Sequence, residues 1–300
     1  MNSILNNMAA VGGQAPTDII GHLTWAGVGA MLITRDELKQ KLIDSGLGEG
    51  WMPKPIRLPD AFRRATSAKF RQELPDGKIE NYMFREVTSN KQTVQRNLVC
   101  ETVDTKGRRL DYDGAAGIVI LDKNTDTIDT SHTSPIASQM VQNAVLRFDI
   151  CKNHYESTTL RTVMTNVLKS MSPTPVRQSG GVYFVPKQFD LELQAYIEFI
   201  RSLEKGESEK IPVINTNDMR GMITRKLLEH LKGTLYACKA GVDNQLRKAE
   251  LKTLLDDAKR IVEDYKQYES IVTGDLKDME QLCLSIRQNI AVALQNMADD

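Results

Sequence analysis

The sequence predicts an α+β protein in which an antiparallel β-meander with helices precedes two mainly helical regions. Apolar and polar side chains alternate with period two between residues 79 and 132, as in half-buried strands. From Ser134 onwards the apolar period becomes helical, and a short hairpin pattern interrupts it at 175–186. We therefore expect a flexible tail (1–18), an α+β meander domain (19–133), a winged-helix-like unit (134–205), a linker (206–216) and a C-terminal long-helix hairpin or three-helix bundle (217–300).

The composition excludes several classes of protein. The chain has 300 residues, 26% of them charged, and its formal net charge is zero. No field of the whole protein would therefore attract nucleic acid or membrane, so such a partner needs a local patch. The N-terminus lacks the pattern of a secretory signal, and no run of about 18 apolar residues occurs. We expect no membrane partner, four reduced cysteines and a cytoplasmic location.

Before the meander, the sequence predicts a strand or strand pair over 19–33 and a short capped helix. Thr34-Arg-Asp-Glu37 has the spacing of a capping box, and Gly46 is suited to end the helix. A second, basic helix is expected over 60–72. Its cations either form a solvated face or contact phosphates. They are Arg63, Arg64, Lys69 and Arg71.

Turn residues divide the meander into strands that should pair with their neighbours. Connections this short permit only antiparallel pairing. The strands are expected at 81–88, 93–104, 108–112, 117–122 and 127–130. Their apolar face needs a cover, and the capped helix beginning near Thr34 is the expected one.

The winged-helix-like unit is predicted from the order helix, turn, helix, hairpin. Ser134-Pro135 begins the first helix and Ser157 caps the second. Ser179-Gly180-Gly181 supplies a hairpin turn, because glycine adopts positive φ without strain. A third helix is expected over 190–203.

An electrostatic anomaly marks this unit: no Asp or Glu occurs between Ser157 and Phe189. The polar side of the second helix instead carries cationic and hydrogen-bonding groups, the types that contact phosphates and base edges. The alternative is a neutral, Thr-rich surface whose lack of acids is either chance or serves packing against the meander. The residues expected to bind nucleic acid are Arg161, Thr162, Thr165, Asn166, Lys169, Arg177 and Lys187.

No catalytic or metal-binding motif stands beside this patch. Cys151 and His154 have the spacing of half a zinc site, but a structural site needs four ligands, and Cys151 falls on an apolar helical stripe. Neither a nucleophile elbow nor a phosphate loop occurs. We therefore expect no enzyme activity, no cofactor and no metal.

The C-terminal region has heptad spacing, which predicts long paired helices. Surplus apolar positions favour a homo-oligomer, unless the helix near Asp218–Ala240 covers them in a three-helix bundle. The expected oligomer interface comprises Leu254, Ile261, Val262, Tyr265, Tyr268, Val292 and Leu294.

Three segments together resemble a family of uncharacterised proteins carried by phages, plasmids and some archaeal elements. The segments are Trp25…Ile33-Thr-Arg-Asp-Glu-Leu38, Pro59-Asp-Ala-Phe-Arg-Arg-Ala-Thr66 and Arg177-Gln-Ser-Gly-Gly-Val-Tyr-Phe-Val-Pro186. The resemblance covers about residues 20–205. It implies a mobile-element protein in a prokaryotic cytoplasm and carries over no activity. The sequence thus leaves two hypotheses: a nucleic-acid-binding protein, or a protein-interaction or assembly factor such as an inhibitor of a host protein, with the winged-helix-like unit as a scaffold.

Overall fold

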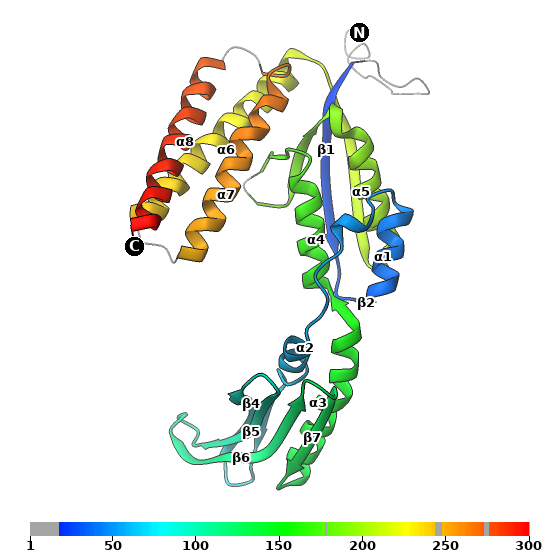
Figure 1. Cartoon of the computed structure of the whole chain (residues 1–300), viewed down its shortest axis with the longest axis vertical. Helices are drawn as coiled ribbons and strands as arrows, with labels where there is room; N and C mark the ends of the chain where they lie inside the picture. Colours follow the sequence, from blue (N-terminus) through cyan, green and yellow to red (C-terminus); the bar gives the residue numbers. More distant parts are fainter. Residues whose placement is uncertain (1–17, 178, 244–247, 273–275, 300) are drawn as a thin grey trace, which may run out of the picture. The chain divides into compact units, whose positions relative to one another are not determined.

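The computed structural model describes residues 18–177, 179–243, 248–272 and 276–299. It has the predicted mixed α+β architecture with antiparallel sheets (Figure 1). The tail expected at 1–18 lies outside the described residues except for Asp18. Contacts divide the chain into a sheet-and-bundle unit (1–31, 39–52 and 160–300) and a meander unit (32–38 and 53–159). Among the described residues, no helix combines the length and apolar character of a membrane span.

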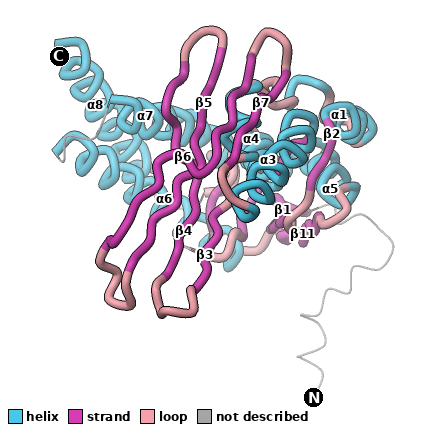
Figure 2. Tube along the Cα trace, turned by 90° about the horizontal axis from the view of Figure 1, so that it is seen from below, coloured by secondary structure: helices cyan, strands magenta, loops and turns pink. Residues whose placement is uncertain are grey.

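The predicted meander is confirmed as a five-stranded antiparallel sheet in the order β3-β4-β5-β6-β7 (Figure 2). Its strands are β3 (Lys69–Glu73), β4 (Ile79–Ser89), β5 (Thr93–Val103), β6 (Arg109–Asp122) and β7 (Thr127–His132). The turn expected at Asp113-Gly114 is wrong, because β6 continues through it. The register against β5 shifts between Leu98 and Cys100, and the Asn97 side chain donates a hydrogen bond to the Gly114 carbonyl (3.0 Å). A β-bulge therefore absorbs these residues within one strand.

Two helices, α2 (Leu58–Ala65) and α3 (Pro135–Asn153), cover the apolar face of this sheet. Phe62 and Phe148 meet edge to face with centroids 6.1 Å apart. Gly117 admits α3 closely, since a Cβ there would lie 2.9 Å from Val141. The capped helix α1 (Arg35–Asp44) contributes no residue to this core, so the cover expected from the sequence is wrong.

The basic helix expected over 60–72 is also shorter than predicted. The Thr66 hydroxyl donates to the Phe62 carbonyl (2.6 Å) and occupies an acceptor at the end of α2. The chain then forms β3, in which Lys69 lies opposite Met83 and Arg71 opposite Asn81. Lys69 and Arg71 thus lie on a strand and not beside Arg63 on a helix.

The region 134–205 does not form one compact unit. The side chain of Ser134 caps α3 as predicted, accepting a hydrogen bond from the Ala137 amide (3.2 Å). A short strand β8 (His154–Glu156) then pairs with β2 (Leu32–Thr34). The boundary between the two units falls inside the next helix, α4 (Ser157–Lys169), between Thr159 and Leu160.

The predicted hairpin is present, but it lies within a larger sheet and is no separate wing. Strands β9 (Thr174–Pro175) and β10 (Val182–Pro186) pair, and Gly180 and Gly181 have φ of 106° and 66°. Strand β1 (Ile19–Val28) lies next to β10 and completes the order β11-β1-β10-β9. The segment expected as a linker is mostly β11 (Gly206–Ile214), which pairs along the whole of β1.

Helix α5 (Asp190–Ser202) packs on this sheet with the predicted stripe of Leu193, Ile197 and Ile200 buried. The short 3₁₀ helix η3 (Lys187–Phe189) leads into it from β10.

A second short 3₁₀ helix, η2 (Glu49–Trp51), follows α1. At the start of α1, the Thr34 hydroxyl accepts the Glu37 amide hydrogen bond (3.2 Å), which is the first half of the predicted capping box.

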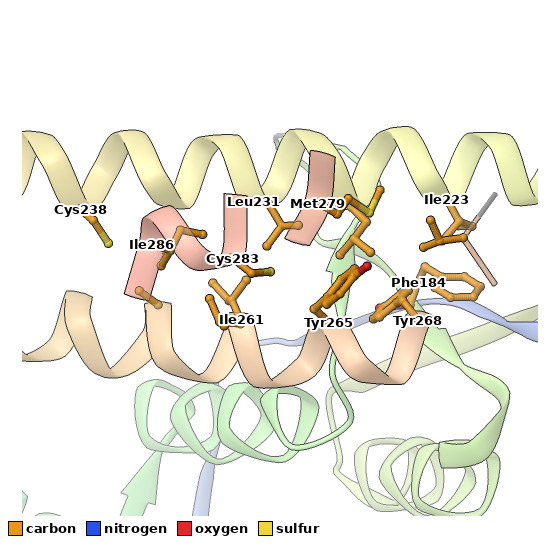
Figure 3. Close-up of a cluster of buried hydrophobic side chains, with 14 of the residues drawn as sticks. Phe184, Ile223, Leu231, Cys238, Ile261, Tyr265, Tyr268, Met279, Cys283 and Ile286 are labelled. Atoms are coloured by element: carbon orange, nitrogen blue, oxygen red, sulfur yellow. The ribbon is translucent and has the colours of Figure 1, made fainter. Parts of the chain in front are cut away.

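The C-terminal region contains the predicted helical hairpin, α7 (Lys248–Asp264) and α8 (Leu276–Asp299). Helix α6 (Asn217–Asp243) packs against both, so the alternative of a three-helix bundle is the one observed (Figures 1 and 3). The 3₁₀ helix η4 (Tyr265–Tyr268) extends α7. Tyr268 lies beside Phe184 of β10, with ring centroids 6.0 Å apart, so the bundle and the sheet share one core (Figure 3).

This packing places most of the residues predicted for an oligomer interface inside the chain's own bundle. Four of its residues, Ile261, Val262, Tyr265 and Tyr268, are buried in the core of this chain's own bundle, and Leu254 packs against it partly buried. Of the remaining two, Val292 is 53% exposed and the side chain of Leu294 lies outside the described residues. Helix α6 supplies the cover that a second chain was expected to supply.

Candidate ligand pocket beside helix α4

The sheet-and-bundle unit contains a cavity of about 470 Å³, which we call the α4 pocket. Its walls come from β1, α4, the hairpin, α5 and the bundle helices α6 and α7. The polar and aromatic side chains lining it are Thr24, Trp25, Arg161, Thr165, Lys169, Tyr183, Tyr196, His230 and Arg260. Segments far apart in the sequence thus meet around one hollow.

The pocket opens where the sheet loses a strand. Pairing between β1 and β10 ends at Trp25 opposite Val182, whereas β11 continues beside β1 as far as Val28. On the β10 side, the end of β1 therefore has no strand partner among the described residues. Helix α4 lies there instead, and the Arg161 guanidinium donates a hydrogen bond to the Val28 carbonyl (2.8 Å).

Helix α4 lines this hollow with a mixed side, on which Arg161, Thr165 and Lys169 lie beside the apolar Met164 and Leu168. Leu160, Val163 and Val167 are buried at helical spacing, as predicted. Among the residues expected to bind nucleic acid, Arg161, Thr165 and Lys169 line the α4 pocket. The others lie apart from it: Thr162 and Asn166 are exposed on α4, Arg177 follows β9, and Lys187 is exposed in η3.

The opposite wall is a network of charges on α7. The Lys169 ammonium forms an ion pair with Asp257 (2.7 Å), which links α4 to α7. Arg260 pairs with Asp264 (2.7 Å), and Asp264 accepts a hydrogen bond from the Ser172 hydroxyl (2.8 Å). Burial raises the pKa of the Asp264 carboxyl, although Ser172 and Arg260 oppose the shift. The Nε of Arg260 is buried without a hydrogen-bond partner among the described residues.

His230 of α6 lies where the α4 pocket meets a second cavity. Burial and the neighbouring Arg260 charge lower the pKa of His230, so its imidazole is neutral at pH 7. The second cavity measures about 350 Å³ and also has Pro175 and His230 in its wall. Arg177 also lines it, so a fourth predicted contact lies in the cavity that shares His230 with the α4 pocket.

Aromatic and apolar side chains complete the α4 pocket. Trp25 and Tyr183 line it from β1 and β10, and Met164 and Leu168 line it from α4. Tyr196 is buried on α5, and that burial raises its pKa. The pocket therefore combines flat apolar surfaces with guanidinium and ammonium groups, the combination that can hold an aromatic ring and an anionic group together.

The basic residues of α2 have local partners instead. Arg63 pairs with Asp60 (3.1 Å), and Arg64 pairs with Glu156 (3.3 Å). The Arg64 guanidinium also donates to the carbonyls of Cys151 and His154. These contacts anchor the end of α3. Arg64 therefore has a structural role in the meander unit that explains its presence without a ligand.

Metal binding finds no support in the described ranges, which contain no group of three or more His, Cys, Asp or Glu able to hold an ion. Cys151 is buried in the core of the meander unit, where burial raises the pKa of its thiol. A thiol buried among apolar neighbours packs as a small hydrophobic side chain.

Sequence reasoning missed His230 and Arg260 as pocket residues. No local signal identifies either, because their approach to α4 depends on how the bundle packs. For Trp25, the neighbouring glycines Gly27 and Gly29 gave a partial signal, since glycine in a strand often marks an irregular end.

Comparisons with known proteins assign no activity to this arrangement. A family model described as a family of unknown function (DUF6744) matches residues 19–300. No curated protein and no solved structure is similar enough to this chain to give a match.

Proposed function

This chain belongs to the DUF6744 family of unknown function, and we propose from its own residues that it is a non-enzymatic nucleic-acid-binding protein. The observation that carries the proposal is the lining of the α4 pocket. It has two arginines and a lysine beside aromatic rings, and no Asp or Glu among its described lining residues. Nucleic acid offers what such a lining binds, namely phosphates and the flat faces of bases.

Arg161 is the residue on which we expect affinity to depend most. Its hydrogen-bond acceptor is a neutral backbone carbonyl, that of Val28, and not a carboxylate. By contrast, Lys169 and Arg260 each have an Asp within 2.7 Å. A cation whose charge is not compensated by an adjacent carboxylate attracts a phosphate more strongly. Arg161 therefore supplies more of the pocket's attraction for an anion than either neighbour.

The setting of this function is also part of the proposal. The resemblance of three sequence segments to phage- and plasmid-encoded proteins supports a mobile-element protein that acts in a prokaryotic cytoplasm. The other hypothesis, an assembly factor or inhibitor that binds a host protein, rests on that resemblance alone. We therefore treat it as an outcome of the test.

The test is fluorescence anisotropy with labelled single-stranded and duplex oligonucleotides over a range of salt concentrations. We expect binding at low salt that weakens as salt rises, because each phosphate contact releases counterions. Arg161→Glu should weaken binding at least tenfold, an estimate of about 1.4 kcal/mol for one charge-assisted contact. Lys232→Glu is the matched control, since Lys232 is exposed on α6 and does not line the pocket.

Absence of binding at low salt, or binding that does not respond to salt, would refute the proposal. Equal losses for Arg161→Glu and Lys232→Glu would refute the assignment to the α4 pocket. Circular dichroism of both variants shows whether the fold is kept, because Arg161 also contacts β1. Capture of one defined host protein after nuclease treatment, with no nucleic acid bound, would favour the protein-interaction hypothesis.

A further inference from the structure

The polar side of α4 is held at both ends by the rest of its own unit. At one end Arg161 donates to the Val28 carbonyl of β1 (2.8 Å), and at the other Lys169 pairs with Asp257 of α7 (2.7 Å). Thr165 lies between them in sequence and lines the pocket. A helix that reads a duplex must itself enter a major groove about 12 Å wide. Because β1 and α7 engage Arg161 and Lys169, these two cations are held at the pocket, and of the predicted α4 contacts only Thr162 and Asn166 lie exposed outside it.

The pocket has the size and lining for a small flat group. Its volume of about 470 Å³ lies within the usual range of about 300–1,000 Å³ for small-molecule sites. Trp25 and Tyr183 offer aromatic faces, and Met164 adds an apolar side chain. A base that has left its pairing partner exposes two π-faces that stack on such side chains. A paired base inside a duplex does not.

Hydrogen-bonding capacity is concentrated at the wall formed by the bundle. The Nε of Arg260 is a buried donor without a partner among the described residues, and Arg260 lines the pocket. A buried donor left without an acceptor is costly, so an incoming acceptor would be bound favourably. Neutral His230 beside it can donate or accept, as the edge of a base requires.

We infer that the α4 pocket holds one unpaired nucleotide of a single strand, with its base against Trp25 and Tyr183 and its phosphate near Arg161. This inference rests on the proposed function and names its substrate class. The sugar-phosphate chain on either side of that nucleotide remains outside the pocket. The protein therefore selects single-stranded over duplex nucleic acid.

The experiment compares a labelled oligothymidylate with a blunt duplex of the same length and label. The single strand should bind at least tenfold more tightly. In a Trp51→Phe background Trp25 is the sole tryptophan, and its fluorescence should be quenched on saturation with the single strand. Tyr183→Leu should weaken single-strand binding by about tenfold, whereas Tyr183→Phe, which keeps the ring, should not.

The matched control is Tyr236→Leu, because Tyr236 is 76% exposed on α6 and does not line the pocket. It should leave affinity unchanged. Equal affinity for single strand and duplex, unchanged Trp25 fluorescence at saturation, or equal effects of the Tyr183→Leu and Tyr236→Leu variants would each overturn the inference. If one of these outcomes occurs but binding depends on salt and on Arg161, the inference fails and the proposed function is retained. If the unsubstituted protein binds neither the single strand nor the duplex, both the inference and the proposed function are refuted.

Discussion

Tyr268→Phe tests how the bundle is attached to the hairpin. Tyr268 is 1% exposed, and its hydroxyl donates to the Ser172 carbonyl (2.6 Å) and accepts from the Thr174 hydroxyl (2.8 Å). The substitution keeps the ring against Phe184 and removes these two hydrogen bonds together with a longer one to the Phe184 carbonyl (3.5 Å). Each contributes about 1 kcal/mol, and groups left unpaired in the core add to the loss. We expect the free energy of unfolding to fall by about 2–3 kcal/mol.

The assay is urea unfolding followed by tryptophan fluorescence. Both tryptophans of the chain, Trp25 and Trp51, belong to the same unit as Tyr268, so the signal reports that unit alone. With a slope of about 2 kcal/mol/M, the midpoint should fall by about 1 M. A double-mutant cycle with Thr174→Val isolates the contribution that the hydrogen bond between the Tyr268 and Thr174 side chains makes to the free energy of unfolding.

Tyr265→Phe is the matched control in the same short helix. Tyr265 is buried too, but its hydroxyl has no hydrogen-bond partner among the described residues. Removing an unsatisfied hydroxyl should cost nothing or should stabilise the protein. The reasoning is refuted if Tyr268→Phe costs less than about 0.5 kcal/mol, or if the two variants lose equal stability.

Three further predictions test the packing of the same unit. Gly21→Ala should destabilise the protein by about 1–3 kcal/mol in urea unfolding, because a Cβ there would lie 2.3 Å from a β10 carbonyl oxygen. Gly27→Ala is the control and should cost far less, because a Cβ at Gly27 meets no atom within 4 Å. Burial lowers the pKa of His22, so the unfolded state binds its proton more readily and stability should fall as pH drops below about 6.5. His22→Gln should reduce that fall, measured as unfolding midpoints at several pH values. Val262→Asp should unfold the bundle at a cost of about 4 kcal/mol or more, while Val292→Asp at an exposed site should leave circular dichroism and melting unchanged.

The features predicted correctly from the sequence are those determined by neighbouring residues. The Ser134 cap, the positive φ of Gly180 and Gly181, and the apolar stripes of α4 and α5 each depend on contacts within a few positions. Caps, glycine turns and helical periods are local signals by their physics. These features therefore do not depend on how the helices and sheets pack together.

The features predicted wrongly depend on partners far along the chain. The charged, glycine-containing start of β11 resembles a linker, and its role as a strand follows only from pairing with β1, as at Ser208 opposite Ala26. Likewise, the heptad spacing of Ile261 and Val262 is compatible both with an oligomer interface and with burial inside the chain. In the structure, both residues share a core with residues of α6. Apolar periodicity shows that a face is buried and does not show what buries it.

For the candidate site, the sequence supplied half of the chemistry. The absence of acids around α4 identified Arg161, Thr165 and Lys169, which do line one pocket. It could not show that Asp257, 88 residues after Lys169, compensates that lysine's charge. Nor could it show that Arg260 and His230 complete the wall. The missing residues belong to helices whose placement is decided by the core around Phe184 and Tyr268.

Photo-crosslinking of an iodouracil-substituted single strand, with the attached peptides mapped by mass spectrometry, tests the central claim most directly. Iodouracil bonds to aromatic side chains that it contacts, so its adducts report where a base lies. The account predicts adducts on Trp25 or Tyr183, lost on competition with unlabelled single strand but not with duplex. Adducts confined to the meander unit or to the exposed side of α8 would contradict it.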